Sequence, residues 1–86
     1  MPRVSQFYGI AIYMYYRDHA PPHFHAIYGA DEAVFDIATG AAFIGKLPRR
    51  ARKLVEEWLE LHRAEIQQNW DLAIAGQPLA QIDPLP

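Results

Sequence analysis

A short histidine-rich stretch carries the residues of this sequence that are best suited to chemistry. It runs Asp18-His19-Ala20-Pro21-Pro22-His23-Phe24-His25. His23 and His25 are two residues apart in a segment that should form a strand, so both imidazoles are expected on one face of that strand. The two consecutive prolines stiffen the connection and leave the neighbouring polar side chains little conformational freedom. We therefore treat this stretch as a preorganised candidate site.

Metal binding is the first chemistry that the stretch permits. Two imidazoles at this spacing can share a divalent transition metal such as zinc. His19 or Asp18 could supply a third ligand if the chain folds back across the proline turn. The spacing dictates no fourth ligand. Affinity should fall as the pH decreases, because an imidazole must be neutral to bind a metal.

Two other interpretations of the histidines stay open. One histidine could act as a general base and another as a general acid, with Arg17 stabilising the charge that develops on a phosphate. Alternatively, histidines on the solvent side of a strand often only hydrogen-bond a neighbouring strand or a carboxylate, and prolines can simply protect a sheet edge. The residue types permit all three interpretations.

A compact group of cations is the second feature with chemical meaning. Five of the eight lysines and arginines fall close together, at Lys46, Arg49, Arg50, Arg52 and Lys53. Most of them would lie in the first turns of a helix, where the helix dipole disfavours cations. A bound phosphate or an acidic partner surface would explain this placement. A solvated charged face is the alternative, since Arg52 and Lys53 each precede a glutamate by four residues and can pair with it weakly.

The elements that must position these residues fall into two halves. Up to Gly45 the apolar residues alternate and turn residues recur, which predicts antiparallel strands over residues 6–16, 23–28, 32–37 and 41–44. From Pro48 the apolar residues recur at spacings of three and four, which predicts helical structure over about residues 48–75. Gly76 and Pro78 mark its end, and residues 77–86 should form an extended tail.

The helical segment should not be straight. An unbroken helix of this length would overhang so small a sheet, and its apolar face rotates between the first half and the second. We expect one bent helix, or two helices that meet near His62-Arg63. His62 should face inward as a hydrogen-bonded core histidine, and Trp58 and Trp70 should anchor a core or an interface.

Length and composition bound the class of protein. The 86 residues fit one α+β domain, a small antiparallel meander of three or four strands covered on one face by the C-terminal helical segment. The 51% hydrophobic content excludes a disordered chain. The absence of cysteine excludes a disulfide framework, a thiolate nucleophile and cysteine-ligated zinc. A net charge of -2 argues against a general nucleic-acid binder. The sequence has neither the hydrophobic segment of a signal peptide nor an apolar run long enough to span a membrane, which predicts a cytoplasmic protein without a membrane partner.

The first expected strand has two apolar faces. One face would carry Tyr8, Ile10, Ile12, Met14 and Tyr16, and the other Phe7, Gly9, Ala11, Tyr13 and Tyr15. Only one face can pack against the helix. The other face, with Phe7, Tyr13 and Tyr15 or their alternates, would be partly exposed on a monomer, which predicts a homodimer.

At these residues the chain resembles a known family. The opening Ser5-Gln6-Phe7-Tyr8-Gly9-Ile10, the histidine-rich stretch, the Gly45-Lys46-Leu47-Pro48 junction, Trp58, His62 and Asn69-Trp70 are similar to the small bacterial proteins grouped as domain of unknown function 4160. The resemblance covers nearly the whole chain. It implies a stand-alone bacterial domain, often encoded beside another small protein in an arrangement similar to toxin–antitoxin pairs. It implies no established reaction and assigns no catalytic residue.

Two functions from different classes follow as expectations. The first is a regulatory or interaction module of a two-gene, toxin–antitoxin-like system, which binds the protein from the adjacent gene and an anionic ligand. The alternative is a histidine- or metal-dependent phosphodiester hydrolase, similar to a ribonuclease, with nucleic acid as its substrate. Bound metal and loss of nuclease activity in a His23→Ala variant would favour the enzyme. Co-purification with the neighbouring gene product, without turnover, would favour the module.

Overall fold

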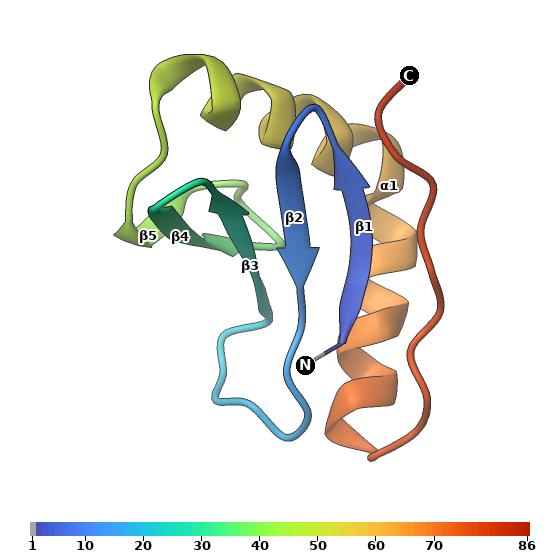
Figure 1. Ribbon diagram of the computed structural model, residues 1–86. Coiled ribbons are helices and arrows are strands. Elements are labelled where there is room, and N and C mark those ends of the chain that lie inside the picture. Colours follow the sequence, from blue (N-terminus) through green and yellow to red (C-terminus); the bar gives the residue numbers. More distant parts are fainter. Residues whose placement is uncertain (1) are drawn as a thin grey trace.

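Five strands and one long helix make up the computed structural model, which describes residues 2–86 (Figure 1). The elements are β1 (Arg3–Phe7), β2 (Ile10–Tyr13), β3 (His23–Tyr28), β4 (Asp31–Asp36), β5 (Ala42–Gly45) and α1 (Arg49–Ile74). The strands form one antiparallel sheet in the order β1-β2-β3-β4-β5, so each strand pairs with its neighbour in the chain. The α+β class and the antiparallel meander are confirmed, but the sheet has five strands rather than three or four.

The extra strand comes from a turn inside the first expected strand. Residues 6–16 do not form one strand, because Tyr8 and Gly9 separate β1 from β2 with positive φ angles of 49° and 79°. Two consecutive positive φ angles are typical of the tight hairpin turn that matches the twist of paired strands. Apolar and aromatic residues continue on both sides of this turn, so the alternation alone did not reveal it.

The core lies between the sheet and α1, which sits behind the sheet in the view of Figure 1. One expected face of the first strand is buried at Ile10 and Ile12 of β2 and at Met14, which follows β2, and these three residues are at most 1% exposed. Phe7 is also buried, contrary to the expectation that it lies on the outer face, because the Tyr8-Gly9 turn interrupts the alternation. Its ring stacks on that of Trp58 at a centroid distance of 5.6 Å.

Helix α1 is bent, as its length predicted. His62 has non-helical backbone angles (φ -124°, ψ 20°), and the helix continues on both sides of it. The first half of α1 crosses the upper end of the sheet and the second half descends behind β1 (Figure 1). The His62 side chain is largely buried, lies 5.7 Å from the Trp58 ring and hydrogen-bonds Glu65 through Nδ1 at 2.6 Å. Pro48 keeps an extended ψ of 149° and so precedes the helix instead of starting it.

The C-terminal tail covers one edge of the sheet. It runs beside β1 (Figure 1), where the Ile82 amide donates to the Val4 carbonyl at 2.8 Å and the Gln81 side chain donates to the Arg3 carbonyl at 2.7 Å. At the other edge, all four residues of β5 are exposed. An uncovered edge offers unpaired N–H and C=O groups to another chain. In the part of the chain described, no helix is both long enough and apolar enough to cross a lipid bilayer.

Asn69 fastens the tail to the helix, which leads to a stability prediction. Its side chain is 1% exposed, donates to the Ala80 carbonyl at 2.8 Å and accepts from the Ala80 amide at 3.0 Å. Asn69→Ala should lower the free energy of unfolding by roughly 1–3 kcal/mol, because both backbone groups of Ala80 lose their partner. Urea denaturation measures the loss. Gln68→Ala, at an exposed neighbouring position, is the control, and equal losses in the two variants would contradict the role of Asn69.

Candidate metal centre

The loop between β2 and β3 folds Asp18 back onto the start of β3. Asp18, His23 and His25 each bring one possible ligand atom, and the three atoms lie within 4.8 Å of one another. Asp18 Oδ2 is 2.8 Å from His23 Nε2 and 3.6 Å from His25 Nε2. Of the two residues expected as a possible third ligand, Asp18 is therefore the one that joins the histidines.

Sheet pairing and aromatic packing fix the two imidazole rings. His25 stands between Tyr13 of β2 and Val34 of β4 in the register of the sheet. The Tyr15 ring meets the His25 ring edge-on at 4.5 Å. The His23 ring, in a residue only 8% exposed, packs against Trp70 at 5.1 Å. These contacts leave the ligand nitrogens little freedom to turn away from Asp18.

Hydrogen bonds define which nitrogen of each ring carries a proton. His23 Nδ1 lies 2.7 Å from the Pro21 carbonyl oxygen, which can only accept, so Nδ1 donates. His25 Nδ1 lies 3.1 Å from a carboxylate oxygen of Glu32 and donates to it in the same way. In a neutral imidazole the other nitrogen, Nε2, then has a free lone pair. Both Nε2 atoms lie close to the same carboxylate oxygen of Asp18, at 2.8 Å for His23 and 3.6 Å for His25.

This arrangement brings together three atoms with lone pairs, namely the Nε2 atoms of His23 and His25 and one carboxylate oxygen of Asp18. A positive charge between them, from a proton or a metal ion, would stabilise the group. A proton can join His23 Nε2 to Asp18, but His25 Nε2 is buried and has no hydrogen-bond partner within residues 2–86. A buried polar atom without a partner is costly. One divalent cation would satisfy all three donors. Metal-binding histidines also commonly donate their second ring N–H to a carbonyl or a carboxylate, as Pro21 and Glu32 allow here.

The protonation states of the acidic neighbours fit a cation. Partial burial raises the pKa of Asp18, but the hydrogen bond from the His19 amide and the interactions with the His23 and His25 rings outweigh it, so the net pKa lies below the ordinary value. Asp18 is therefore ionised at neutral pH. Burial, followed by the nearby Glu32, raises the pKa of Tyr15, so its hydroxyl stays protonated there. The carboxylate of Asp18 supplies the anionic ligand of the cluster.

The cluster opens into a hollow of about 260 Å³. The lining residues are Asp18, His19, Ala20, Pro21, His23, His25, Val34, Phe43 and Ile44. Much of the wall is apolar, and Phe43 and Ile44 come from the exposed strand β5. A small molecule therefore has room beside the three ligand atoms.

The other residues expected near the histidines have different positions. The His19 side chain is exposed and lines the hollow, while its backbone amide donates to Asp18 Oδ1 at 2.8 Å. The Arg17 guanidinium lies against Gly76, beyond the end of α1, where a cation is favoured by the helix dipole. Arg17 is not among the residues that line the hollow. Glu32 was not expected at the site, although the short turn between β3 and β4 brings it close to His25.

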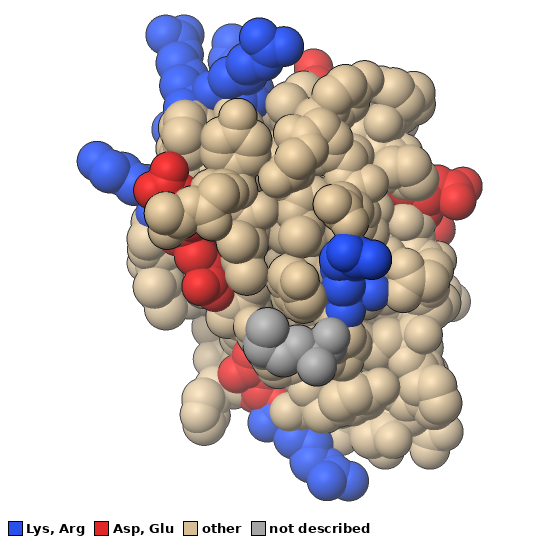
Figure 2. Space-filling view, viewed as in Figure 1, with Lys and Arg blue, Asp and Glu red and all other residues tan. Residues whose placement is uncertain are grey.

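The group of cations occupies a separate part of the surface. Lys46, Arg49, Arg50, Arg52 and Lys53 are all exposed at and just before the start of α1. Figure 2 shows blue side chains gathered at the top of the molecule, over the first turns of α1. Arg52 pairs with Glu56 at 3.8 Å, as expected for residues four apart. No ion pair joins Lys53 to Glu57 in the described chain. Four of them, Lys46, Arg49, Arg50 and Lys53, line other hollows than the one beside the histidines.

Comparison with known proteins identifies one relationship. The family model described as "Domain of unknown function (DUF4160)" matches residues 9–71, which include the whole histidine-rich stretch and most of α1. No curated protein and no solved structure matches the chain.

Proposed function

The chain belongs to the DUF4160 family, whose description assigns no reaction, and we propose that it is a metal-dependent phosphodiester hydrolase, similar to a ribonuclease. The metal would be held by Asp18, His23 and His25. The observation that carries the metal site in this proposal is the buried Nε2 atom of His25, which has no hydrogen-bond partner and lies 3.6 Å from the Asp18 carboxylate.

Three protein ligands beside an open hollow favour catalysis over a purely structural ion. Structural zinc sites usually have four protein ligands, whereas catalytic sites leave a position for water or substrate. A divalent ion held there would polarise a water molecule and lower its pKa. The Pro21 carbonyl and Glu32 would keep both histidines in the binding tautomer.

The residues around the hollow would take part in the remaining steps of a hydrolysis. The oxygen of water would bond to phosphorus and lose a proton to the solvent, the P–O ester bond would break, and the leaving oxygen would take a proton. His19 lines the hollow without joining the ligand cluster, so its exposed imidazole would give that proton when protonated. The apolar side chains of Phe43 and Ile44 would limit the access of bulk water.

The test compares the zinc-loaded protein with the chelator-treated protein. Metal content per chain is measured first, and cleavage of a short single-stranded RNA and of an activated phosphodiester is then followed in both forms. We expect one zinc ion per chain and cleavage that depends on it. Protein that binds no zinc, or that cleaves equally well in chelator, would reject the metal-dependent mechanism. In the second case metal-free acid–base catalysis by the histidines would replace it.

The second candidate function is an interaction module of a two-gene system, and the exposed edge of the sheet favours it. β5 contains Phe43, 46% exposed, and Ile44, 59% exposed. An extended segment from another protein, or β5 of a second copy in a homodimer, could add a strand there. Stable co-purification with the adjacent gene product, combined with no turnover by the zinc-loaded protein, would favour this module over the hydrolase.

A further inference from the structure

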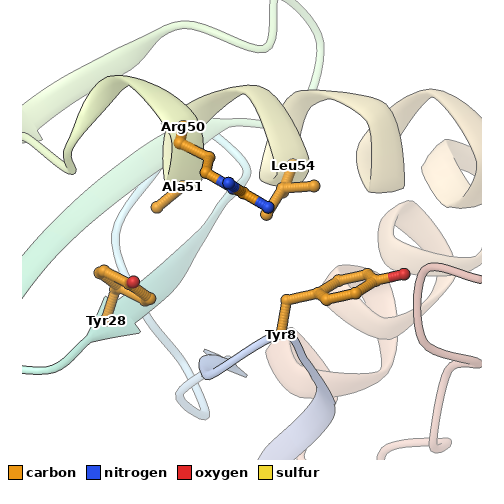
Figure 3. A pocket seen from close by; sticks show the side chains of 5 residues that line it. All are labelled: Tyr8, Tyr28, Arg50, Ala51 and Leu54. Atoms are coloured by element: carbon orange, nitrogen blue, oxygen red, sulfur yellow. The ribbon is translucent and has the colours of Figure 1, made fainter.

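A second hollow lies far along β3 from the histidines, beneath the start of α1. Its volume is about 480 Å³, and it is lined by Tyr8, Tyr28, Arg50, Ala51 and Leu54 (Figure 3). The β1–β2 turn contributes Tyr8, the end of β3 contributes Tyr28, and α1 contributes the other three residues. None of these residues belongs to the metal centre or lines its hollow.

Two exposed aromatic rings form the floor of this hollow. Tyr8 is 60% exposed and Tyr28 is 39% exposed. The Tyr8 hydroxyl donates to the Pro86 carbonyl at 2.7 Å. The Tyr28 ring lies against the β1–β2 turn, since a Cβ atom on Gly9 would be 3.5 Å from its Cε1 atom. The two rings therefore offer flat, accessible surfaces to a ligand.

One cation without an acidic partner stands above the rings, and two more lie beside it. Figure 3 shows the Arg50 side chain reaching from α1 over the space between Tyr8 and Tyr28. Arg49, Arg50 and Lys53 line an adjoining hollow of about 470 Å³, and none of the three takes part in an ion pair within residues 2–86. The first turn of α1 has no acidic residue. The carboxylate in this lining is that of Glu57, and Glu57 and Glu60 also line the hollow on the other side of Tyr8, so the cations gather on the Tyr28 side.

From this combination we propose that the hollow binds nucleotides of a single-stranded nucleic acid. A base would stack on Tyr28 or Tyr8, and the neighbouring phosphates would contact Arg50, Arg49 and Lys53. Stacking platforms beside unpaired cations are how proteins bind single strands without reading their sequence. A simple anion would not use the rings, and an apolar ligand would not use the arginines. The overall charge of -2 argues against general binding of nucleic acid, but five of the eight cations gather at the start of α1, where Figure 2 shows the largest group of blue side chains.

This site is independent of the proposed hydrolase, so it is tested with chelator present and without turnover. The probe is a labelled single-stranded RNA of about eight nucleotides, within the usual site size of such proteins, followed by fluorescence anisotropy. We expect binding that weakens with added salt. Tyr28→Leu should weaken it by about tenfold because stacking is lost, whereas Tyr28→Phe should retain it. Thermal melting checks that each variant is folded.

Two arginines of α1 provide a matched pair of variants. Arg50→Gln and Arg52→Gln change the net charge equally, but Arg50 reaches over the rings while Arg52 pairs with Glu56 and lines neither hollow. We expect a loss of about tenfold from Arg50→Gln and a much smaller loss from Arg52→Gln. Equal losses would overturn the proposal, because they would indicate unspecific attraction to the helix surface.

Competition identifies the form of the ligand. Displacement of the RNA by free uridine monophosphate would support a nucleotide site that does not need a strand, and displacement by unlabelled RNA alone would support a strand site. Displacement by inorganic phosphate as readily as by nucleotide would overturn the proposal, since the tyrosines would then play no part. The absence of binding by both the RNA and the mononucleotide would also overturn it.

Discussion

His25→Ala is expected to abolish zinc binding at the cluster of Asp18, His23 and His25. The variant removes the ligand atom that has no other partner, and leaves two donors. Loss of a group that only hydrogen-bonds to a metal ligand costs roughly 10- to 100-fold in affinity, so loss of a ligand itself should exceed that range. Competition with a zinc-binding dye measures the affinity, and metal analysis after dialysis measures the stoichiometry.

His19→Ala is the matched control because it makes the same change six residues earlier. His19 lines the same hollow but contributes only its backbone amide to Asp18. Zinc affinity should therefore remain, while turnover should fall if His19 donates the proton to the leaving oxygen. A wild-type protein that binds no zinc, or equal zinc affinity in His25→Ala and wild type, would contradict the metal centre. The two readouts thus separate the metal ligand from the proton donor.

The sequence predicted the strand that carries the two histidines of the candidate site. The bounds of β3 agree with the expected strand over residues 23–28, and the rings of His23 and His25 lie 5.4 Å apart. Strand periodicity and the turn at Gly29-Ala30 suffice for that prediction, because they depend on neighbouring residues only. The choice between Asp18 and His19 as third ligand could not be made, since it depends on the path of the loop between β2 and β3.

Contacts between residues far apart in the sequence could be predicted only with the pairing register of the whole sheet. The Tyr8-Gly9 turn was missed because apolar residues alternate before and after it, and a hairpin turn of this kind has a weak signal when tyrosine replaces the usual asparagine or aspartate. Once β1 and β2 are separate, Ile10 pairs with Tyr28, which places Tyr28 beside Gly9 and near Tyr8. The hollow lined by Tyr8 and Tyr28 therefore depends on the Tyr8-Gly9 turn, which the sequence pattern did not reveal.

The bend of α1, in contrast, could be predicted from the spacing of apolar residues along the helix. The rotation of the apolar face predicted a break near His62, where the kink occurs. Two halves with different apolar faces cannot both contact one sheet on a straight axis. Asn69 and Trp70, in the second half, then reach the tail and the His23 ring, respectively. The bend thus lets the second half of α1 contact His23 of the candidate site through Trp70.

Trp58→Ala should have the largest effect on stability. The Trp58 side chain is fully buried, packs against Phe7 and Phe24 at centroid distances of 5.6 and 5.7 Å, and donates from Nε1 to the Asp83 carbonyl at 2.9 Å. Truncation of a buried tryptophan to alanine costs about 3–5 kcal/mol through lost burial and the remaining cavity. Small domains unfold with only about 5–15 kcal/mol, so the variant should be close to the limit of folding. Urea denaturation monitored by circular dichroism measures the change.

Leu61→Ala, at a position 61% exposed on the same helix, is the control and should cost far less. Equal losses in the two variants would contradict the central position of Trp58 in the core. The same core also supports the candidate metal centre, because Phe24 lies on β3 between the two histidines and stacks on Phe35 at 5.5 Å. Zinc that binds only the folded state should therefore raise the denaturation midpoint of Trp58→Ala, by an amount that grows with the zinc concentration. A midpoint that zinc leaves unchanged in both this variant and the wild type would show that the histidines on β3 hold no metal in the folded state.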